Sequence, residues 1–147
     1  MHLWRAFWRL EASRRRLAFE AGALLVLVHI GLRLCSYTRL HRALCVLASR
    51  RAIGSSASPA GHTDVAWAVT AAGRRLPLKT TCLVEALVTD AMLRGRHHAS
   101  QVRFGVRLGE HQPQLDAHAW VECEGDLVIG MLDDLNDYTP LAKSIGS

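Results

Sequence analysis

The chain has 147 residues, half of them hydrophobic, and a formal net charge of +5. This length suits one compact domain with a small helical attachment, and it is too short for two independent cores. The four cysteines form no CxxC pair, which excludes a zinc knuckle and a dense disulfide framework and indicates reduced thiols in a cytoplasmic protein. Arginines concentrate in the first third without an aromatic ladder or a glycine-rich nucleic-acid motif, so nucleic acid is the least favoured partner.

Residues 1–20 predict a basic amphipathic helix, and residues 21–32 form the most apolar stretch of the chain. This uncharged run is shorter than the roughly 20 residues that a bilayer requires, and Arg33 follows it. No small-x-small cleavage site follows either, which disfavours a signal peptide. We expect a helix buried against the protein or a partner, with membrane-surface contact through residues 1–34 as the alternative. A further short helix runs to about residue 52.

The stretch 54–61 is rich in glycine, serine and proline and predicts a linker. We therefore divide the chain into an N-terminal helical extension (1–53), the linker (54–61) and a main domain (62–147). Thr63 is expected to cap a helix that Gly73 ends, with an apolar face formed by Val65, Ala68, Val69 and Ala72.

A second helix is predicted to begin at Cys82, because Thr81 is a suitable N-cap and Gly95 a suitable stop. Its apolar stripe consists of Val84, Leu87, Val88, Ala91 and Met92. Unpaired backbone N–H groups and the positive end of the helix dipole stabilise a thiolate in the first turn, which would make Cys82 a nucleophile. The alternative is that Cys82 is a small buried apolar residue.

Alternating residues 102–108 and 117–123 predict two half-buried strands, separated by a polar loop at 110–114. The turn at Glu124-Gly125 and the return at 127–129 predict a hairpin. Strand alternation places His118, Trp120 and Glu122 on one face. If this sheet packs against the Cys82 helix, the His118 imidazole could take the proton of the thiol and later protonate a leaving amine.

For the remaining candidate residues, the sequence also allows a purely structural role. Trp120 is expected to form a wall of the cleft or part of the core, with a binding platform for substrate as the alternative, and Glu122 either contacts substrate or is an exposed strand residue. The adjacent histidines His97 and His98 are expected to be solvated, because no carboxylate or cysteine stands at ligand spacing, so no metal site is predicted. The remaining cysteines, Cys35, Cys45 and Cys123, are interpreted as packing thiols.

Several segments of the second half resemble one known family. They are Thr80-Thr81-Cys82-Leu83, the basic stretch 94–96, the strand 102–108, Ala117-His118-Ala119-Trp120-Val121-Glu122, Gly125, Val128-Ile129-Gly130 and Tyr138-Thr139-Pro140-Leu141. In this order they resemble the B2 proteins of lasso peptide biosynthesis, which are leader peptidases with a transglutaminase-like, papain-related fold. The resemblance covers about residues 62–142 and implies that Cys82 is the nucleophile and His118 the general base.

The resemblance also implies a third catalytic residue, an aspartate about twelve positions after the histidine, and this position is Gly130 here. Such a carboxylate fixes the imidazole tautomer and stabilises the imidazolium. Asp133 and Asp134 lie just beyond and are equally possible replacements, while Asp116 precedes His118 on the same strand face and Asp126 lies at the hairpin turn. A backbone carbonyl or a water molecule is a further alternative.

Together these features predict an α+β fold of the transglutaminase-like or papain-like class with an N-terminal helical extension. The resemblance implies a cysteine endopeptidase that removes the leader from a ribosomally made precursor peptide, together with a B1 leader-recognition protein and a lasso cyclase C. An acyltransferase with the same Cys–His pair and a non-catalytic scaffold remain open. No nucleotide-phosphate loop is present, so no cofactor is expected and ATP use would belong to a partner.

Overall fold

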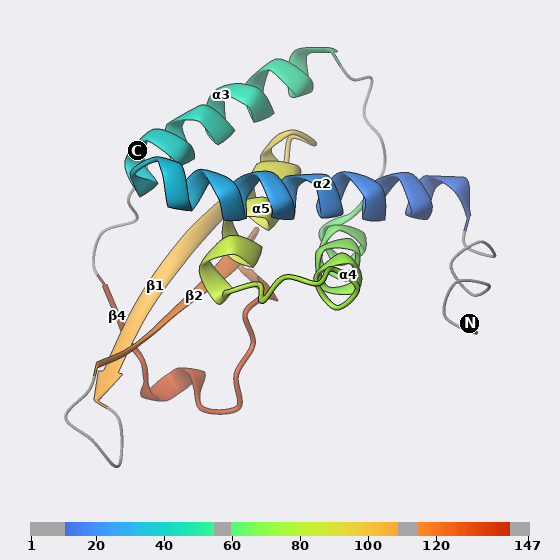
Figure 1. Cartoon of the computed structure of the whole chain (residues 1–147). Coiled ribbons are helices and arrows are strands. Elements are labelled where there is room, and N and C mark those ends of the chain that lie inside the picture. Colours follow the sequence, from blue (N-terminus) through green and yellow to red (C-terminus); the bar gives the residue numbers. More distant parts are fainter. Residues whose placement is uncertain (1–10, 55–59, 109–114, 142–147) are drawn as a thin grey trace.

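A computed structural model describes residues 11–54, 60–108 and 115–141 (Figure 1). The described part is an α+β fold in which helices pack against an antiparallel sheet. Its elements are α2 (Ala12–Leu34), α3 (Tyr37–Gly54), α4 (His62–Gly73), α5 (Cys82–Arg94), β1 (Ser100–Leu108), β2 (Leu115–Cys123), β3 (Asp126–Ile129), the 3₁₀ helix η1 (Leu135–Asp137) and β4 (Thr139–Pro140).

The strands follow the order β3-β2-β1-β4, and every neighbouring pair is antiparallel. The long pair β1 and β2 sets the register, with Gly105 opposite His118. The predicted hairpin turn between β2 and β3 is confirmed, because Glu124 and Gly125 have φ values of 54° and 95°, as a two-residue turn of the mirror-image type requires. The predicted loop at 110–114 lies outside the described residues.

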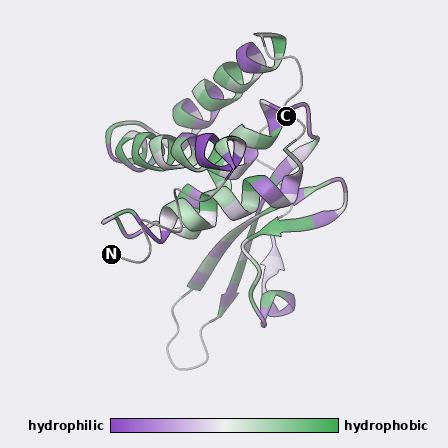
Figure 2. Ribbon diagram, turned by 90° about the vertical axis from the view of Figure 1, so that its right-hand side faces the viewer, coloured by the Kyte–Doolittle hydropathy of each residue, from purple (hydrophilic) through white to green (hydrophobic). Residues whose placement is uncertain are grey.

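The sheet separates two packed regions. Ala119, Val121 and Cys123 of β2 belong to the hydrophobic cluster that also contains the buried residues of α2, α4 and α5. Figure 2 shows these helices stacked on one side of the strands. Trp120 is buried outside that cluster, beneath the returning segment that carries Gly130 and Tyr138. The alternation predicted for β2 is therefore confirmed, and each face of the sheet has its own core.

The N-terminal helix differs from its predicted form. One continuous helix, α2, begins at Ala12 and joins the basic segment to the apolar run, whereas two separate segments were expected; residues 1–10 lie outside the description. Leu25 and Val28 are fully buried and share the cluster with α4 and α5. The helices before the predicted linker thus supply part of the common core. The division of the chain at 54–61 stays a prediction.

Two helix starts illustrate how capping decides a boundary. The helix α4 begins at His62 with Gly61 as its N-cap, so Thr63 lies inside the first turn instead of capping it. Val65, Ala68, Val69 and Ala72 are nevertheless all buried, as their spacing predicts. The helix α5 begins at Cys82, and the Thr81 side chain accepts a hydrogen bond from the Val84 N–H.

The helix α2 is also long and apolar enough to cross a membrane, with a mean hydropathy of 1.8 in its most apolar window, of which 33% is buried within the protein. Core helices of soluble proteins have the same length and composition, so the helix alone does not assign the chain to a membrane. Its buried residues contact α4 and α5, and a separate stripe of apolar side chains stays exposed.

Candidate active site

The thiol of Cys82 is the candidate nucleophile, and α5 places it at the first residue of the helix. Thr81 caps this end, and the Thr80 hydroxyl donates a hydrogen bond of 2.8 Å to Glu85 one turn further on. Cys82 is a free, partly exposed thiol at the margin of the core. Its first-turn position therefore leaves the sulfur accessible, beside backbone N–H groups that have no partner within the helix.

The imidazole of His118 is the candidate base, and β2 holds it at its exposed end. Its Nε2 lies 2.8 Å from the Gly130 carbonyl oxygen. Because a carbonyl only accepts, Nε2 carries the hydrogen and Nδ1 keeps its lone pair. The ring also stacks on Trp120 at 6.3 Å and tilts against Tyr138 at 5.7 Å. These contacts fix both the ring plane and the tautomer in which Nδ1 can accept a proton.

The two candidate groups lie on packed elements, since α5 packs against β2. His118 shares the sheet face of Trp120, whereas the neighbouring Ala119 faces the helices. Within the described part of the chain, no hydrogen bond joins the Cys82 sulfur to either ring nitrogen, and the approach of these two groups expected from the sequence is not tested. Because the helices cover the Ala119 face, direct proton transfer between Cys82 and His118 stays a prediction.

The carboxylate expected to orient His118 is elsewhere. Asp134 forms a short ion pair with Arg107, and Asp133 is exposed without a hydrogen bond to the imidazole. The position that the resemblance assigns to an aspartate does contact the ring, but through the backbone carbonyl of Gly130. Arg107 binds the Asp134 carboxylate, and the imidazole is instead contacted by a backbone carbonyl, one of the alternatives considered from the sequence.

Gly130 is required by its backbone conformation and by its neighbours. Its φ is 90°, and a Cβ atom there would lie 2.7 Å from the Trp120 Cβ and 2.8 Å from the Ala119 carbonyl oxygen. Gly105 opposite His118 is similarly confined, since its Cβ would lie 2.9 Å from both Trp120 and Tyr138. Gly105 lets its backbone approach the Trp120 ring, and Gly130 lets its backbone approach the Cα and Cβ atoms of Trp120. At Gly130 the carbonyl oxygen also contacts His118.

An ion network borders the His118 ring. The Tyr138 hydroxyl donates a hydrogen bond of 2.7 Å to Asp116, and the Arg107 guanidinium lies 3.3 Å from the same carboxylate and over the Tyr138 ring. The hydrogen bond from Tyr138, followed by Arg107, holds the pKa of Asp116 below its usual range. The sequence interpretation included Asp116 and the 138–141 segment but missed Arg107, whose place opposite Asp116 follows only from the strand register.

The two predicted substrate-binding residues have partners within the protein. Trp120 is 5% exposed, and its indole N–H donates to Glu122 at 3.1 Å. Glu122 also forms an ion pair with Arg103. Trp120 is thus a buried wall behind His118, and its role in binding, like that of Glu122, stays a prediction.

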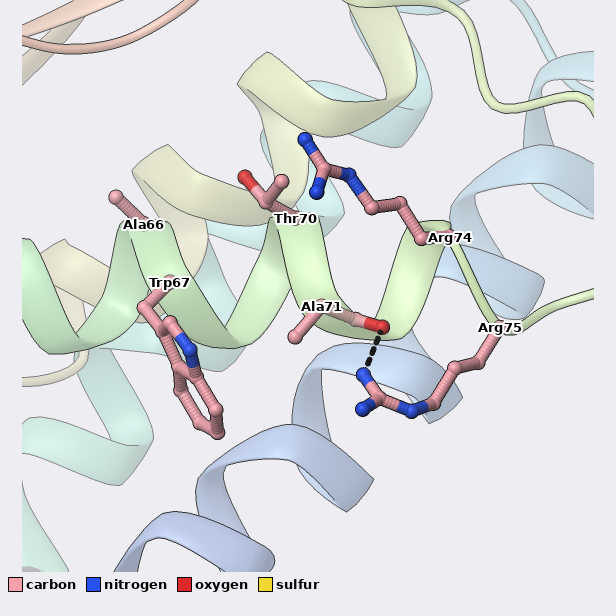
Figure 3. A pocket seen from close by; sticks show the side chains of 6 residues that line it. All are labelled: Ala66, Trp67, Thr70, Ala71, Arg74 and Arg75. Atoms are coloured by element: carbon pink, nitrogen blue, oxygen red, sulfur yellow. Dashed lines mark hydrogen bonds between the residues drawn. The ribbon is translucent and has the colours of Figure 1, made fainter. Parts of the chain in front are cut away.

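A pocket on the outer side of α4 does not coincide with this site (Figure 3). Arg75 curls back over it and donates a hydrogen bond of 2.8 Å to the Ala71 carbonyl. Its lining contains no cysteine, histidine or carboxylate and consists of Ala66, Trp67, Thr70, Ala71, Arg74 and Arg75. The chemistry of Cys82 and His118 therefore identifies the candidate site better than the shape of this surface does.

Residues 24–143 match the family model of the transglutaminase-like superfamily, which spans most of the chain and both candidate catalytic residues. The chain belongs to this superfamily. Transglutaminase-like domains generally carry out catalysis of the cysteine protease type, which agrees with a thiol at a helix start followed by a histidine on a strand. The matched region begins within α2, as does the shared core. No curated protein and no solved structure matches the chain at a significant level.

Proposed function

We propose that this transglutaminase-like protein is a cysteine endopeptidase that removes the leader from a precursor peptide during lasso peptide maturation. The observation that carries the proposal is the hydrogen bond from His118 Nε2 to the Gly130 carbonyl, because it leaves Nδ1 as the free base. The accessible Cys82 thiol at the start of α5 supplies the nucleophile. The resemblance to the lasso B2 proteins supports the peptide substrate.

In this mechanism Nδ1 of His118 takes the thiol proton, and the Cys82 sulfur attacks the scissile carbonyl carbon. First-turn backbone N–H groups of α5 stabilise the oxyanion. The C–N bond then breaks as the imidazolium protonates the leaving amine, which gives a thioester on Cys82. Water attacks the thioester with His118 as base, releasing the acid and the free thiol. The Gly130 carbonyl accepts the Nε2 hydrogen and keeps the ring oriented through these steps.

The test is cleavage of a precursor peptide in the presence of the B1 leader-recognition protein, followed by mass spectrometry. We expect Cys82→Ala and His118→Ala each to lower the rate by at least about 10⁴-fold, as loss of a nucleophile or base does elsewhere. Cys35→Ala is the matched control, because Cys35 is a free, exposed thiol outside the site. Unchanged processing by folded Cys82→Ala protein would contradict the proposal and favour a scaffold role.

An acyltransferase would use the same two residues, Cys82 and His118. Adding a primary amine distinguishes acyl transfer from hydrolysis. With an added primary amine, a peptidase gives the free carboxylate of the leader, whereas a transferase gives the amide. We expect the carboxylate. A product whose mass shows amine incorporation as the main species would assign acyl transfer instead.

We further propose that the exposed apolar stripe of α2 is the docking surface for the precursor, B1 or the cyclase. Phe19, Leu27, Ile30 and Leu34 recur at helical spacing and are 65, 62, 47 and 78% exposed. A deletion of residues 1–53 would remove buried core as well, so point variants are the sharper test. Leu27→Glu should lower processing with B1 while the melting temperature stays unchanged; unaltered processing would contradict docking there. Flotation with anionic vesicles tests the membrane-surface alternative.

A further inference from the structure

A second group of reactive side chains lies away from Cys82, at the hairpin end of the sheet. His98 follows α5, Cys123 ends β2 and Glu124 begins the turn to β3. One ligand atom from each of these residues lies within 4.8 Å of the other two. No carboxylate or cysteine lies at metal-ligand spacing from the paired histidines in the sequence, because Glu124 is 26 positions from His98 along the chain. Antiparallel pairing of β1 with β2 brings them together.

Both nitrogens of the His98 ring lie near oxygen acceptors. Its Nε2 lies 3.3 Å from the Ala60 carbonyl oxygen, and its Nδ1 lies 3.4 Å from the Glu124 carboxylate. The carbonyl only accepts, so Nε2 carries the hydrogen in the neutral ring and the Nδ1 lone pair faces a carboxylate that also only accepts. Two facing acceptors require a proton or another cation between them. Histidines that bind metals commonly donate their second ring N–H to a carbonyl in this way.

A third group, the Cys123 thiol, supplies a donor atom that a metal would use and a proton would not need. A protonated imidazole would satisfy Glu124 without any thiol, whereas here the Cys123 sulfur also converges on the same point. Cys123 is fully buried, so a metal bound there would be screened from water on the core side. Glu124 and His98 have side chains 58% and 24% exposed, which leaves an entry path from solvent.

We propose that His98, Cys123 and Glu124 bind one divalent zinc-class metal ion. Imidazole nitrogen, thiolate sulfur and carboxylate oxygen are the donor types that zinc(II) prefers, and water completes a tetrahedral site. The ion would tie the connection between α5 and β1 to the turn between β2 and β3, at the opposite end of β2 from His118. This site does not rest on the proposed peptidase function.

The test is titration of the reduced, chelator-treated full chain with cobalt(II), a coloured substitute for zinc(II). We expect one equivalent to give the visible bands of tetrahedral cobalt and a sulfur-to-cobalt charge-transfer band, both lost when zinc is added. His98→Gln should weaken binding by more than about tenfold, since even outer ligands of a metal site contribute that much. His97→Gln is the matched control and should bind normally, because the His97 ring instead contacts the Ala52 carbonyl.

Two further variants test which cysteine thiol binds the metal. Cys123→Ser should abolish the charge-transfer band, whereas Cys82→Ala should leave it unchanged. A band that survives in Cys123→Ser, or that disappears in Cys82→Ala, would overturn the proposal. Absence of any cobalt spectrum at one equivalent would overturn it as well.

Because Cys123 is buried, its variant could fail to fold, and Glu124→Asn provides an independent test. Glu124 has a φ of 54°, a conformation that asparagine adopts more readily than glutamate. Glu124→Asn should therefore keep the melting temperature of the metal-free protein while losing more than about tenfold in metal affinity. If zinc raises the melting temperature of this variant as much as that of the parent, the assignment of Glu124 is wrong.

Discussion

At the scale of single residues, position 130 shows how a backbone group can replace a side chain. A glycine with φ of 90° turns its carbonyl towards His118, where the resemblance would place a carboxylate. A carbonyl fixes the tautomer as a carboxylate does, but it carries no charge to stabilise an imidazolium. An aspartate at this position would supply that charge, yet the surrounding packing argues against the substitution.

We predict that Gly130→Asp destabilises the protein by about 3 kcal/mol or more and does not increase activity. The new Cβ would overlap the Trp120 side chain and the Ala119 carbonyl, and the left-handed backbone adds about 1–3 kcal/mol of strain. Gly125→Asp is the matched control: φ is 95°, but nothing lies within 4 Å of its Cβ position, so only the strain applies. Urea unfolding of both variants measures the difference. Equal losses would show that the contacts at Gly130 are unimportant.

At the scale of elements, a buried polar contact fixes α3 to α5. The Arg94 Nε–H donates to both oxygens of the Asp90 carboxylate, at 3.0 and 2.9 Å, and the Ser100 hydroxyl donates to it at 2.7 Å. His41 of α3 lies 3.9 Å from the same carboxylate. His41 also stacks on Tyr37 and lies 3.8 Å from the Cys45 sulfur. Burial lowers the pKa of His41, an effect that Asp90 opposes and Arg94 reinforces.

This lowered pKa predicts a loss of stability in mild acid. Folding lowers the pKa of His41, whereas the unfolded chain protonates this side chain near the ordinary value of 6.5. Below pH 6.5 the unfolded state therefore binds more protons at His41 than the folded state does. The contribution of His41 to the free energy of unfolding is present above pH 6.5 and is lost as the pH falls through the lower pKa of the folded state. Urea midpoints at about pH 7.5 and pH 5.5 should fall less in His41→Gln than in the parent chain. Equal falls would assign the acid sensitivity to other groups.

The elements also show what sequence patterns could predict. The α5 boundaries and the β2–β3 hairpin follow from local signals, namely a capping threonine, a terminal glycine and a Glu-Gly turn. The continuity of α2 was missed because the change from arginines to leucines suggested a boundary, although helical backbone continues through both. The short strand β4 offers too few residues for an alternating pattern. The partners of Asp134 and His98 depend on register and tertiary contact, and neither is visible in spacing.

At the scale of the whole molecule, Glu20 joins three parts of the chain that are distant in sequence. From α2 its carboxylate contacts Arg51 of α3 at 2.6 Å and Arg96, which follows α5, at 2.8 Å. The side chains of Glu20 and Arg96 are only 17% and 14% exposed, so solvent screens this pair less than a surface pair. Arg96 Nε is already a buried donor without a partner among the described residues. Loss of Glu20 would leave a largely buried guanidinium with still fewer acceptors.

We therefore predict that Glu20→Ala lowers the unfolding free energy by about 2–3 kcal/mol, between the costs of breaking exposed and fully buried pairs. Arg14→Ala is the control, because the Arg14–Asp64 pair also links α2 to α4 but is 50% and 35% exposed, and its loss should cost no more than about 1 kcal/mol. Urea unfolding followed by circular dichroism measures both. If α2 were a separate attachment, Glu20→Ala would unfold α2 in an earlier transition and leave the main transition unchanged. A single cooperative transition shifted to lower urea is expected, since Leu25 and Val28 of α2 complete the core over α4 and α5.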